Sequence, residues 1–225
     1  MVEGARLEIV WAAKSRRFES SRFRQTSLAF ATRPKGRTLP PVFNFGDKMN
    51  QAIFEFFGVN ETWEKITDVL LVAVILILGV FAVLGLVQWI QRKDIRKVDK
   101  ELLFMLPSLF LIVVIYFVFA KVWIINYRPV LIDGVAEPSF PSSHALVAVT
   151  VLSMVMKALP KYVSDKRVRV IIDVLMVIIM GLIAFGRVAA GMHWLTDVLG
   201  GIIFGWVLGL VYQLLLKKFG EDKNE

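Results

Sequence analysis

The chain has 225 residues, of which 56% are hydrophobic and 20% are charged, and its formal net charge is +8. Soluble domains contain about 45–50% apolar residues, so this composition, with a mean hydropathy of +0.63, argues against a soluble fold. The absence of cysteine excludes disulfide bonds.

Residues 1–48 form a basic leader with ten Lys or Arg against four Asp or Glu, a net of +6 out of the total +8. The overall charge is therefore mostly a property of this segment and does not indicate a nucleic-acid partner. The leader has no long apolar core, so it is not an ordinary secretory signal. Three interpretations stay open: a non-native start with translation beginning at Met49, a disordered or surface-bound arm, and a transit-like presequence. We expect residues 49–225 to form one membrane-embedded domain.

The sequence QAIFEFFG, at residues 51–58, follows the leader and predicts a short amphipathic helix lying on the membrane surface. Five apolar stretches come next, at residues 69–87, 102–120, 145–156, 174–185 (extended upstream by 170–172) and 198–216. Such stretches predict membrane spans, and they must be helical because backbone groups in hydrocarbon have to pair within the chain. The predicted fold is an all-α integral membrane bundle of about five transmembrane helices plus an N-terminal interfacial helix.

Basic residues predict the orientation of these spans. Lys and Arg concentrate after the first, third and fifth spans, at residues 92–100, 157–169 and 217–223. Because cytoplasmic loops are enriched in Lys and Arg, these segments are expected inside, and the loops at 121–143 and 187–194 outside. Within the fifth span, Gly201, Gly205 and Gly209 recur every four residues, which favours close helix packing.

Polar residues gather at the predicted outer edge, although they come from three separate stretches of sequence. They are Lys121, Arg128, His144, Arg187, His193 and Asp197. A single Lys or Arg at a span end usually extends its charge towards lipid phosphates. Three cations and both histidines of the chain at one edge instead indicate a functional site.

Three fixed cations match a small, densely charged group with several oxygens, such as phosphate. The PSSH segment supports this interpretation, because Ser142 or Ser143 caps the third span and free N–H groups at a helix start bind anions. His193 and Asp197 share a helix face at positions i and i+4, so the carboxylate favours a nucleophilic imidazole. His144 has no acid beside it in sequence and is expected to protonate the departing oxygen.

These residues resemble the three-part signature of the type 2 phosphatidic acid phosphatase superfamily. The signature blocks K-x6-RP, PSxH and R-x5-H-x3-D correspond to residues 121–129, 141–144 and 187–197. The overall layout is most similar to the small prokaryotic branch that includes undecaprenyl-diphosphatases. Two positions depart from the common pattern, which often has Gly at Ser143 and Ser at Gly186.

The resemblance implies a role for each site residue. Phosphate oxygens would be held by Lys121, Arg128, Arg187, the Ser142 hydroxyl and the Ser143 backbone N–H. His193, oriented by Asp197, would attack phosphorus to give a phosphohistidine, and His144 would protonate the leaving group and then activate water. The family requires no metal or other cofactor.

The predicted function is hydrolysis of a polyprenyl diphosphate to the monophosphate, with the site facing the extracytoplasmic side of the cell membrane. The expected partners are the phosphorylated lipid substrate and membrane lipids, and nucleic acid is not expected. Phosphatidylglycerol phosphate and phosphatidate are alternative substrates. A lipid phosphotransferase, a non-enzymatic anion transporter and a vanadate-dependent haloperoxidase are the competing activities, although no inverted repeat of the kind found in many transporters is evident.

Overall fold

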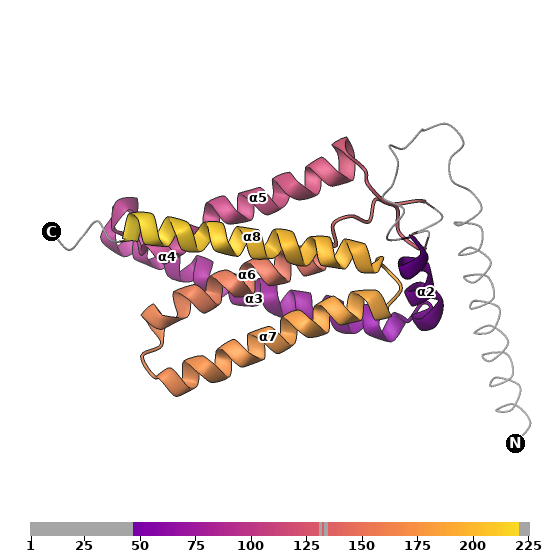
Figure 1. Cartoon of the computed structure of the whole chain (residues 1–225). Helices are drawn as coiled ribbons and strands as arrows, with labels where there is room; N and C mark the ends of the chain where they lie inside the picture. The colour runs from indigo at the N-terminus through magenta and orange to yellow at the C-terminus, as the bar shows by residue number, and fades with distance from the viewer. Residues whose placement is uncertain (1–46, 131, 133–134, 221–225) are drawn as a thin grey trace, which may run out of the picture.

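The computed structural model describes residues 47–130, 132 and 135–220 as a bundle of long helices without a named strand. Figure 1 shows the helices running roughly along one axis, so that the bundle has two ends. Residues 1–46 lie outside the described residues, and with them almost all of the basic leader.

The predicted surface helix is α2, Asp47–Phe57, and it lies at one end of the bundle (Figure 1). The membrane-spanning helices follow in chain order: α3 at Glu61–Arg92, α4 at Lys100–Leu103 continuing through α5 at Met105–Phe117 and η2 at Val118–Val122, α6 at Ser143–Tyr162, α7 at Lys166–Ala189, and α8 at Leu195–Gly220. Five of these stretches are long and apolar enough to cross a membrane. The predicted fold class is therefore confirmed.

Local capping explains why α3 and α7 begin outside the predicted apolar stretches. The Asn60 side chain accepts hydrogen bonds from the backbone N–H groups of Thr62 (3.0 Å) and Trp63 (3.2 Å). Asp165 caps the start of α7 in the same way, through Arg167 N at 2.7 Å. These caps satisfy N–H groups that have no partner within the helix. The first span consequently starts eight residues before position 69, at Glu61.

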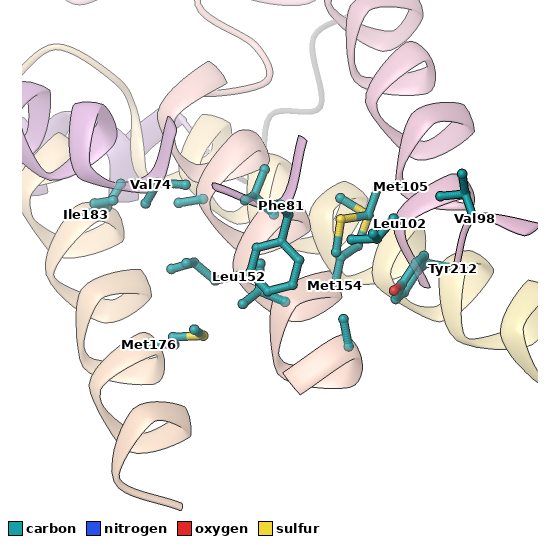
Figure 2. Packing of buried hydrophobic residues seen from close by; sticks show 14 residues of the cluster. Val74, Phe81, Val98, Leu102, Met105, Leu152, Met154, Met176, Ile183 and Tyr212 are labelled. Atoms are coloured by element: carbon teal, nitrogen blue, oxygen red, sulfur yellow. The ribbon is translucent and has the colours of Figure 1, made fainter. Parts of the chain in front are cut away.

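The central helix of the bundle is α6. Within its most apolar stretch 61% of the residues are buried, against 11% for α3 and for α7. Figure 2 shows the cluster packed around it, with Leu152 and Met154 of α6 close to Phe81 of α3 and Tyr212 of α8. Because lipid is as apolar as these side chains, close packing rather than release of water stabilises this arrangement.

Three glycines of α8 allow it to approach α6 closely. A Cβ atom added at Gly201 would lie 2.7 Å from the Ser142 carbonyl oxygen, one at Gly205 would lie 2.8 Å from Val149 Cβ, and one at Gly209 would lie 3.0 Å from Ser153 Cβ. Glycine fits these spacings without any shift, whereas a side chain at Gly201 or Gly205 would force the helices apart. The close packing that the four-residue spacing predicted is present.

A polar network holds together the end of the bundle opposite α2. Asp99 accepts hydrogen bonds from Gln88 Nε2 at 2.8 Å and from the Tyr162 hydroxyl at 3.1 Å, and Lys161 lies 3.4 Å from its carboxylate. Burial raises the pKa of Asp99, but the Gln88 hydrogen bond and the positive charge of Lys161 outweigh it and lower the pKa overall. The network joins α3 to α6 at the end that carries the basic loops.

At the other end, the connection between η2 and α6 folds back on itself. Arg128 N donates to Glu137 O at 2.9 Å, and Ser139 N donates to Asn126 O at 2.9 Å. The two halves of this outer loop, residues 123–142, therefore run antiparallel. Arg128 and Ser139 both contact His193, which lies just before α8.

Candidate active site

The candidate site is assembled from five parts of the chain at the end of the bundle where α2 lies. They are the start of α3, the outer loop, the first turn of α6, the last turn of α7 and the segment that opens α8. The backbone joins two of these parts directly, because Ser142 N donates a hydrogen bond to Asp197 O at 2.9 Å.

His193 is the most enclosed imidazole of the site, with a side chain only 2% exposed. Its Nδ1 lies 3.0 Å from the Ser139 carbonyl oxygen, which can only accept a hydrogen bond. The proton is therefore on Nδ1 and the lone pair is on Nε2. Nε2 in turn lies 3.4 Å from Nη1 of Arg128, the donor that faces it.

The surroundings of His193 keep it neutral. Burial lowers its pKa well below the usual value, the positive charges of Arg128 and Arg187 lower it further, and the hydrogen bond to Ser139 offsets this only in part. A neutral imidazole with an unprotonated Nε2 is the form that can act as a nucleophile.

Asp197 is completely buried, and its Oδ2 lies 3.8 Å from His193 Nδ1. The same oxygen accepts a hydrogen bond from Trp194 N at 3.0 Å and so caps the start of α8. The carboxylate is thus beside the imidazole as predicted, but the two residues do not share a helix face, because His193 precedes α8, which begins at Leu195. The direct hydrogen-bond partner of Nδ1 is the Ser139 carbonyl.

The second imidazole has an acidic partner that the sequence did not indicate. His144 Nε2 lies 2.9 Å from Oδ1 of Asp68, a residue of α3 that is 76 positions away. Arg187 joins the same group, because its Nη1 lies 3.4 Å from Asp68 Oδ1 and 3.3 Å from the hydroxyl of Thr67. His144 and His193 lie in adjoining parts of the site, because the backbone hydrogen bond between Ser142 and Asp197 joins the start of α6 to the start of α8.

The two serines lie at the helix start as predicted. Ser142 is the N-cap of α6, is buried and makes no side-chain capping hydrogen bond, and Ser143 is the first residue of the helix. Three buried polar atoms here have no hydrogen-bond partner within the described part of the chain, namely Ser142 Oγ, His144 Nδ1 and Arg187 Nε. Arg128 Nε instead lies 3.2 Å from the carboxylate of Glu137. Unpartnered buried donors are rare and usually mark a place for a ligand or an ordered water.

Lys121 is placed differently from the other candidates. It belongs to the π-helical turn η2, and its side chain is exposed. Among the described residues, no hydrogen bond or ion pair connects it to the two histidines or the two arginines. The structure brings seven of the eight candidates together and leaves Lys121 outside their contacts.

Sequence reasoning missed Asp68, Thr67 and Ser139. Asp68 lies just before the apolar stretch at 69–87, but α3 begins at Glu61, so Asp68 lies in the second turn of a membrane helix. An ionisable residue at that position is a signal for function. The role of Ser139 depends on its carbonyl group, which no side-chain motif reveals.

Gly186, where the family pattern often has serine, packs directly against Thr67 of α3. A Cβ at position 186 would lie 2.4 Å from Thr67 Cγ2, so only glycine allows the two helices to meet here. The Thr67 hydroxyl then takes a position against Arg187. In the ranges that the structure covers, no group of three or more His, Asp or Glu side chains is arranged to hold a metal ion.

The chain is similar to known proteins both in sequence and in fold. Residues 72–221 match the family model described as PAP2 superfamily. Phosphatidylglycerophosphatase B of Bacillus subtilis (strain 168) is 36% identical over 107 residues, which are 45% of this chain and 49% of that protein. The chain therefore aligns with about half the length of this curated relative.

The fold is similar to a crystal structure of a transmembrane PAP2-type phosphatidylglycerolphosphate phosphatase from Bacillus subtilis. The TM-score is 0.62 at 19% sequence identity, and the match covers 78% of this chain and 88% of the other. At this identity the likeness concerns the arrangement of the helices.

Proposed function

The chain belongs to the PAP2 superfamily, and from this premise we propose that it is a membrane lipid phosphatase that works through a phosphohistidine on His193. The observation that carries the proposal is the neutral, buried His193, whose free Nε2 faces Arg128 at 3.4 Å. Unpartnered donors of Arg187 and Ser142 lie in the same site. A phosphate group would supply acceptors for these donors and an electrophilic phosphorus for the imidazole.

In the first step, Nε2 of His193 attacks phosphorus while the bond from phosphorus to the lipid oxygen breaks. Arg128 and Arg187 stabilise the negative charge on the phosphoryl oxygens, and N–H groups at the start of α6 add a favourable dipole. His144 gives its proton to the departing oxygen, so the lipid leaves as an alcohol or as a monophosphate.

In the second step, water attacks the phosphohistidine. His144, now neutral, takes a proton from this water as the new O–P bond forms and the N–P bond breaks. Inorganic phosphate is released and His193 returns to its neutral form. Each step uses side chains of this chain alone, and Asp197 stabilises the positive charge that builds up on His193.

Phosphatidylglycerol phosphate is our first choice of substrate. Support comes from the matched relative and the similar structure, whose names both specify phosphatidylglycerol phosphate. A polyprenyl diphosphate, which the sequence favoured, is the second choice. The short outer loop at 123–142 leaves little protein for headgroup recognition, which suits a site that selects mainly by phosphate and lipid tail. Both reactions would take place at the extracytoplasmic face of the cell membrane.

A phosphate-release panel tests the activity and ranks the substrates. Purified full-length protein in detergent micelles is given phosphatidylglycerol phosphate, a polyprenyl diphosphate or phosphatidate, with and without EDTA. We expect release from at least the first substrate, unaffected by the chelator. Adding a lipid alcohol as acceptor separates a hydrolase from a phosphotransferase, since only the latter forms a new phosphorylated lipid. No release from any lipid would contradict the proposal.

The nucleophile is tested by His193→Ala. Because no other group replaces the attacking Nε2, we expect phosphate release from every substrate to fall by about 1,000-fold or more. Gln51→Ala, on the exposed side of α2, is the control and should keep the parental rate. Thermal unfolding in detergent verifies that both variants are folded. A His193→Ala variant with most of the parental rate would refute the assignment.

A further inference from the structure

The first membrane helix contributes an acidic residue to the site, and the mechanism above does not use it. Asp68 Oδ1 lies 2.9 Å from His144 Nε2 and 3.4 Å from Arg187 Nη1. One carboxylate oxygen thus faces both the acid–base histidine and a phosphate-binding arginine. The contact is specific to the folded molecule, because 76 residues separate Asp68 from His144.

The position of Asp68 is fixed by packing on the neighbouring residue. Thr67 is completely buried, and its methyl group lies where a Cβ of residue 186 would otherwise be. Its hydroxyl donates to the Glu64 carbonyl at 2.8 Å and faces Arg187 at 3.3 Å. Because Thr67 packs tightly against Gly186, the next residue of α3, Asp68, points towards the start of α6.

The charges around His144 indicate a role for Asp68. His144 has to carry a proton to serve as a general acid, and Arg187 brings a second positive charge to the same group, with its Nη1 3.4 Å from Asp68 Oδ1. A carboxylate in hydrogen-bond contact with an imidazole favours its protonated form. Asp68 is therefore placed to offset the repulsion from Arg187 and to fix the ring of His144.

We propose that Asp68 is a positioning residue for His144, so that the site contains two carboxylate–imidazole pairs, one for the nucleophile and one for the acid–base group. The inference rests on the proposed phosphatase activity. During the first step the His144 proton passes to the oxygen of the breaking P–O bond, while Asp68 holds the ring in place. During the second step His144 regains a proton from the attacking water, again beside the same carboxylate.

Leaving-group dependence tests this role. An alkyl phosphate lipid needs protonation of its departing oxygen, whereas p-nitrophenolate leaves readily without a proton. In Asp68→Asn we expect kcat/KM for the lipid phosphate to fall by about 10-fold or more, and kcat/KM for p-nitrophenyl phosphate by less than about 3-fold. The ratio of the two values, measured on one preparation, does not depend on the fraction of folded protein.

Glu64→Gln is the matched control. It removes the same charge one helical turn earlier on α3, where the charge still acts on Arg187, but no hydrogen bond connects it to His144 among the described contacts. The ratio of the two kcat/KM values should remain parental in this variant.

Three results would overturn the role of Asp68. Equal falls with both substrates would indicate a purely structural contribution, and unchanged rates would indicate none. Higher rates with both would show that Asp68 competes with phosphate for Arg187. A parent protein that releases phosphate from neither substrate would instead refute the proposed function, and the role of Asp68 with it.

Discussion

At the scale of single residues, the environment of His193 determines when the site is active. The Ser139 carbonyl holds the proton on Nδ1, and Arg128 lies 3.4 Å from Nε2. In the proposed mechanism Arg128 therefore has two functions: it disfavours a proton on Nε2 of His193, and it binds a phosphate oxygen once substrate arrives. The proposed nucleophile is thus kept in its reactive protonation state before the reaction begins.

This arrangement predicts a pH effect of Arg128→Gln. Burial and the charge of Arg128 both lower the pKa of His193. Removing that charge raises the pKa, so the inactive imidazolium persists to higher pH. We expect the acid limb of the kcat/KM profile to move to higher pH. The parent and the variant are measured with the same substrate, so that the ionisation of the substrate contributes equally to both profiles.

Arg128→Lys keeps the positive charge and is the control. Its acid limb should stay closer to the parental position, even if the rate falls because a point charge replaces a two-pronged donor. An acid limb that does not move in Arg128→Gln would show that Arg128 has no influence on the ionisation of His193.

Sequence and structure agree on part of the site. The serines lie at the helix start as predicted, and Asp197 lies beside His193. The predicted shared helix face is wrong, however, because His193 precedes α8 and Asp197 reaches its neighbourhood by capping Trp194 N. Asp68 was missed because its contact depends on how α3 is rotated against α6 and α7. Lys121 lies in the π-helical turn Val118–Val122. Such a turn adds a residue to the helical repeat and redirects the side chains, which regular spacing cannot anticipate.

At the scale of elements, the contact between α6 and α8 determines the geometry of the site. The first turn of α6 carries His144, and α8 begins just after His193. Gly201, Gly205 and Gly209 bring the two helices together directly below these residues. Any increase in the spacing of the helices would also separate the two imidazoles.

We expect Gly205→Ala to reduce both stability and activity. The new Cβ would lie 2.8 Å from Val149 Cβ and 3.0 Å from the Leu146 carbonyl oxygen. Overpacking of this kind costs about 1–3 kcal/mol. Thermal unfolding in detergent and kcat/KM on the preferred lipid measure the two effects.

Gly181→Ala provides the comparison within α7. A Cβ there has no neighbour within 4 Å, and the residue lies inside a helix. The substitution should be neutral or should stabilise by about 0.5–1 kcal/mol. Equal melting temperatures for Gly205→Ala and the parent would mean that the helices can separate without loss.

The helices themselves could be predicted from hydropathy, because a span must be apolar over its whole length. Their ends could not, since they depend on caps such as Asn60 and Asp165 outside the apolar stretches. The fold of the outer loop was also not predictable, because the Arg128–Glu137 and Ser139–Asn126 backbone pairs involve no repeating pattern.

At the scale of the whole molecule, the bundle has two chemically different ends. The basic loops and the Asp99 network lie at one end, and α2 and the candidate site lie at the other (Figure 1). Because cytoplasmic loops are enriched in Lys and Arg, this polarity favours a site that faces the extracytoplasmic side.

Single-cysteine labelling tests the orientation, since the chain has no cysteine of its own. Ala136 in the outer loop and Ser164 between α6 and α7 are both exposed. We expect Ala136→Cys to react with a membrane-impermeant maleimide in intact cells, and Ser164→Cys to react only after permeabilisation. The opposite pattern would reverse the proposed topology.

The division of the site between the first and the last membrane helix has a consequence for biogenesis. A ribosome delivers α3 to the membrane early, whereas the segment carrying His193 and Asp197 emerges near the end of translation. The carboxylate of Asp68 and the arginine of the outer loop are therefore in place before any nucleophile exists. In the proposed mechanism, hydrolytic activity therefore arises in one late step, and a polypeptide that ends before His193 would not hydrolyse the lipids that surround it.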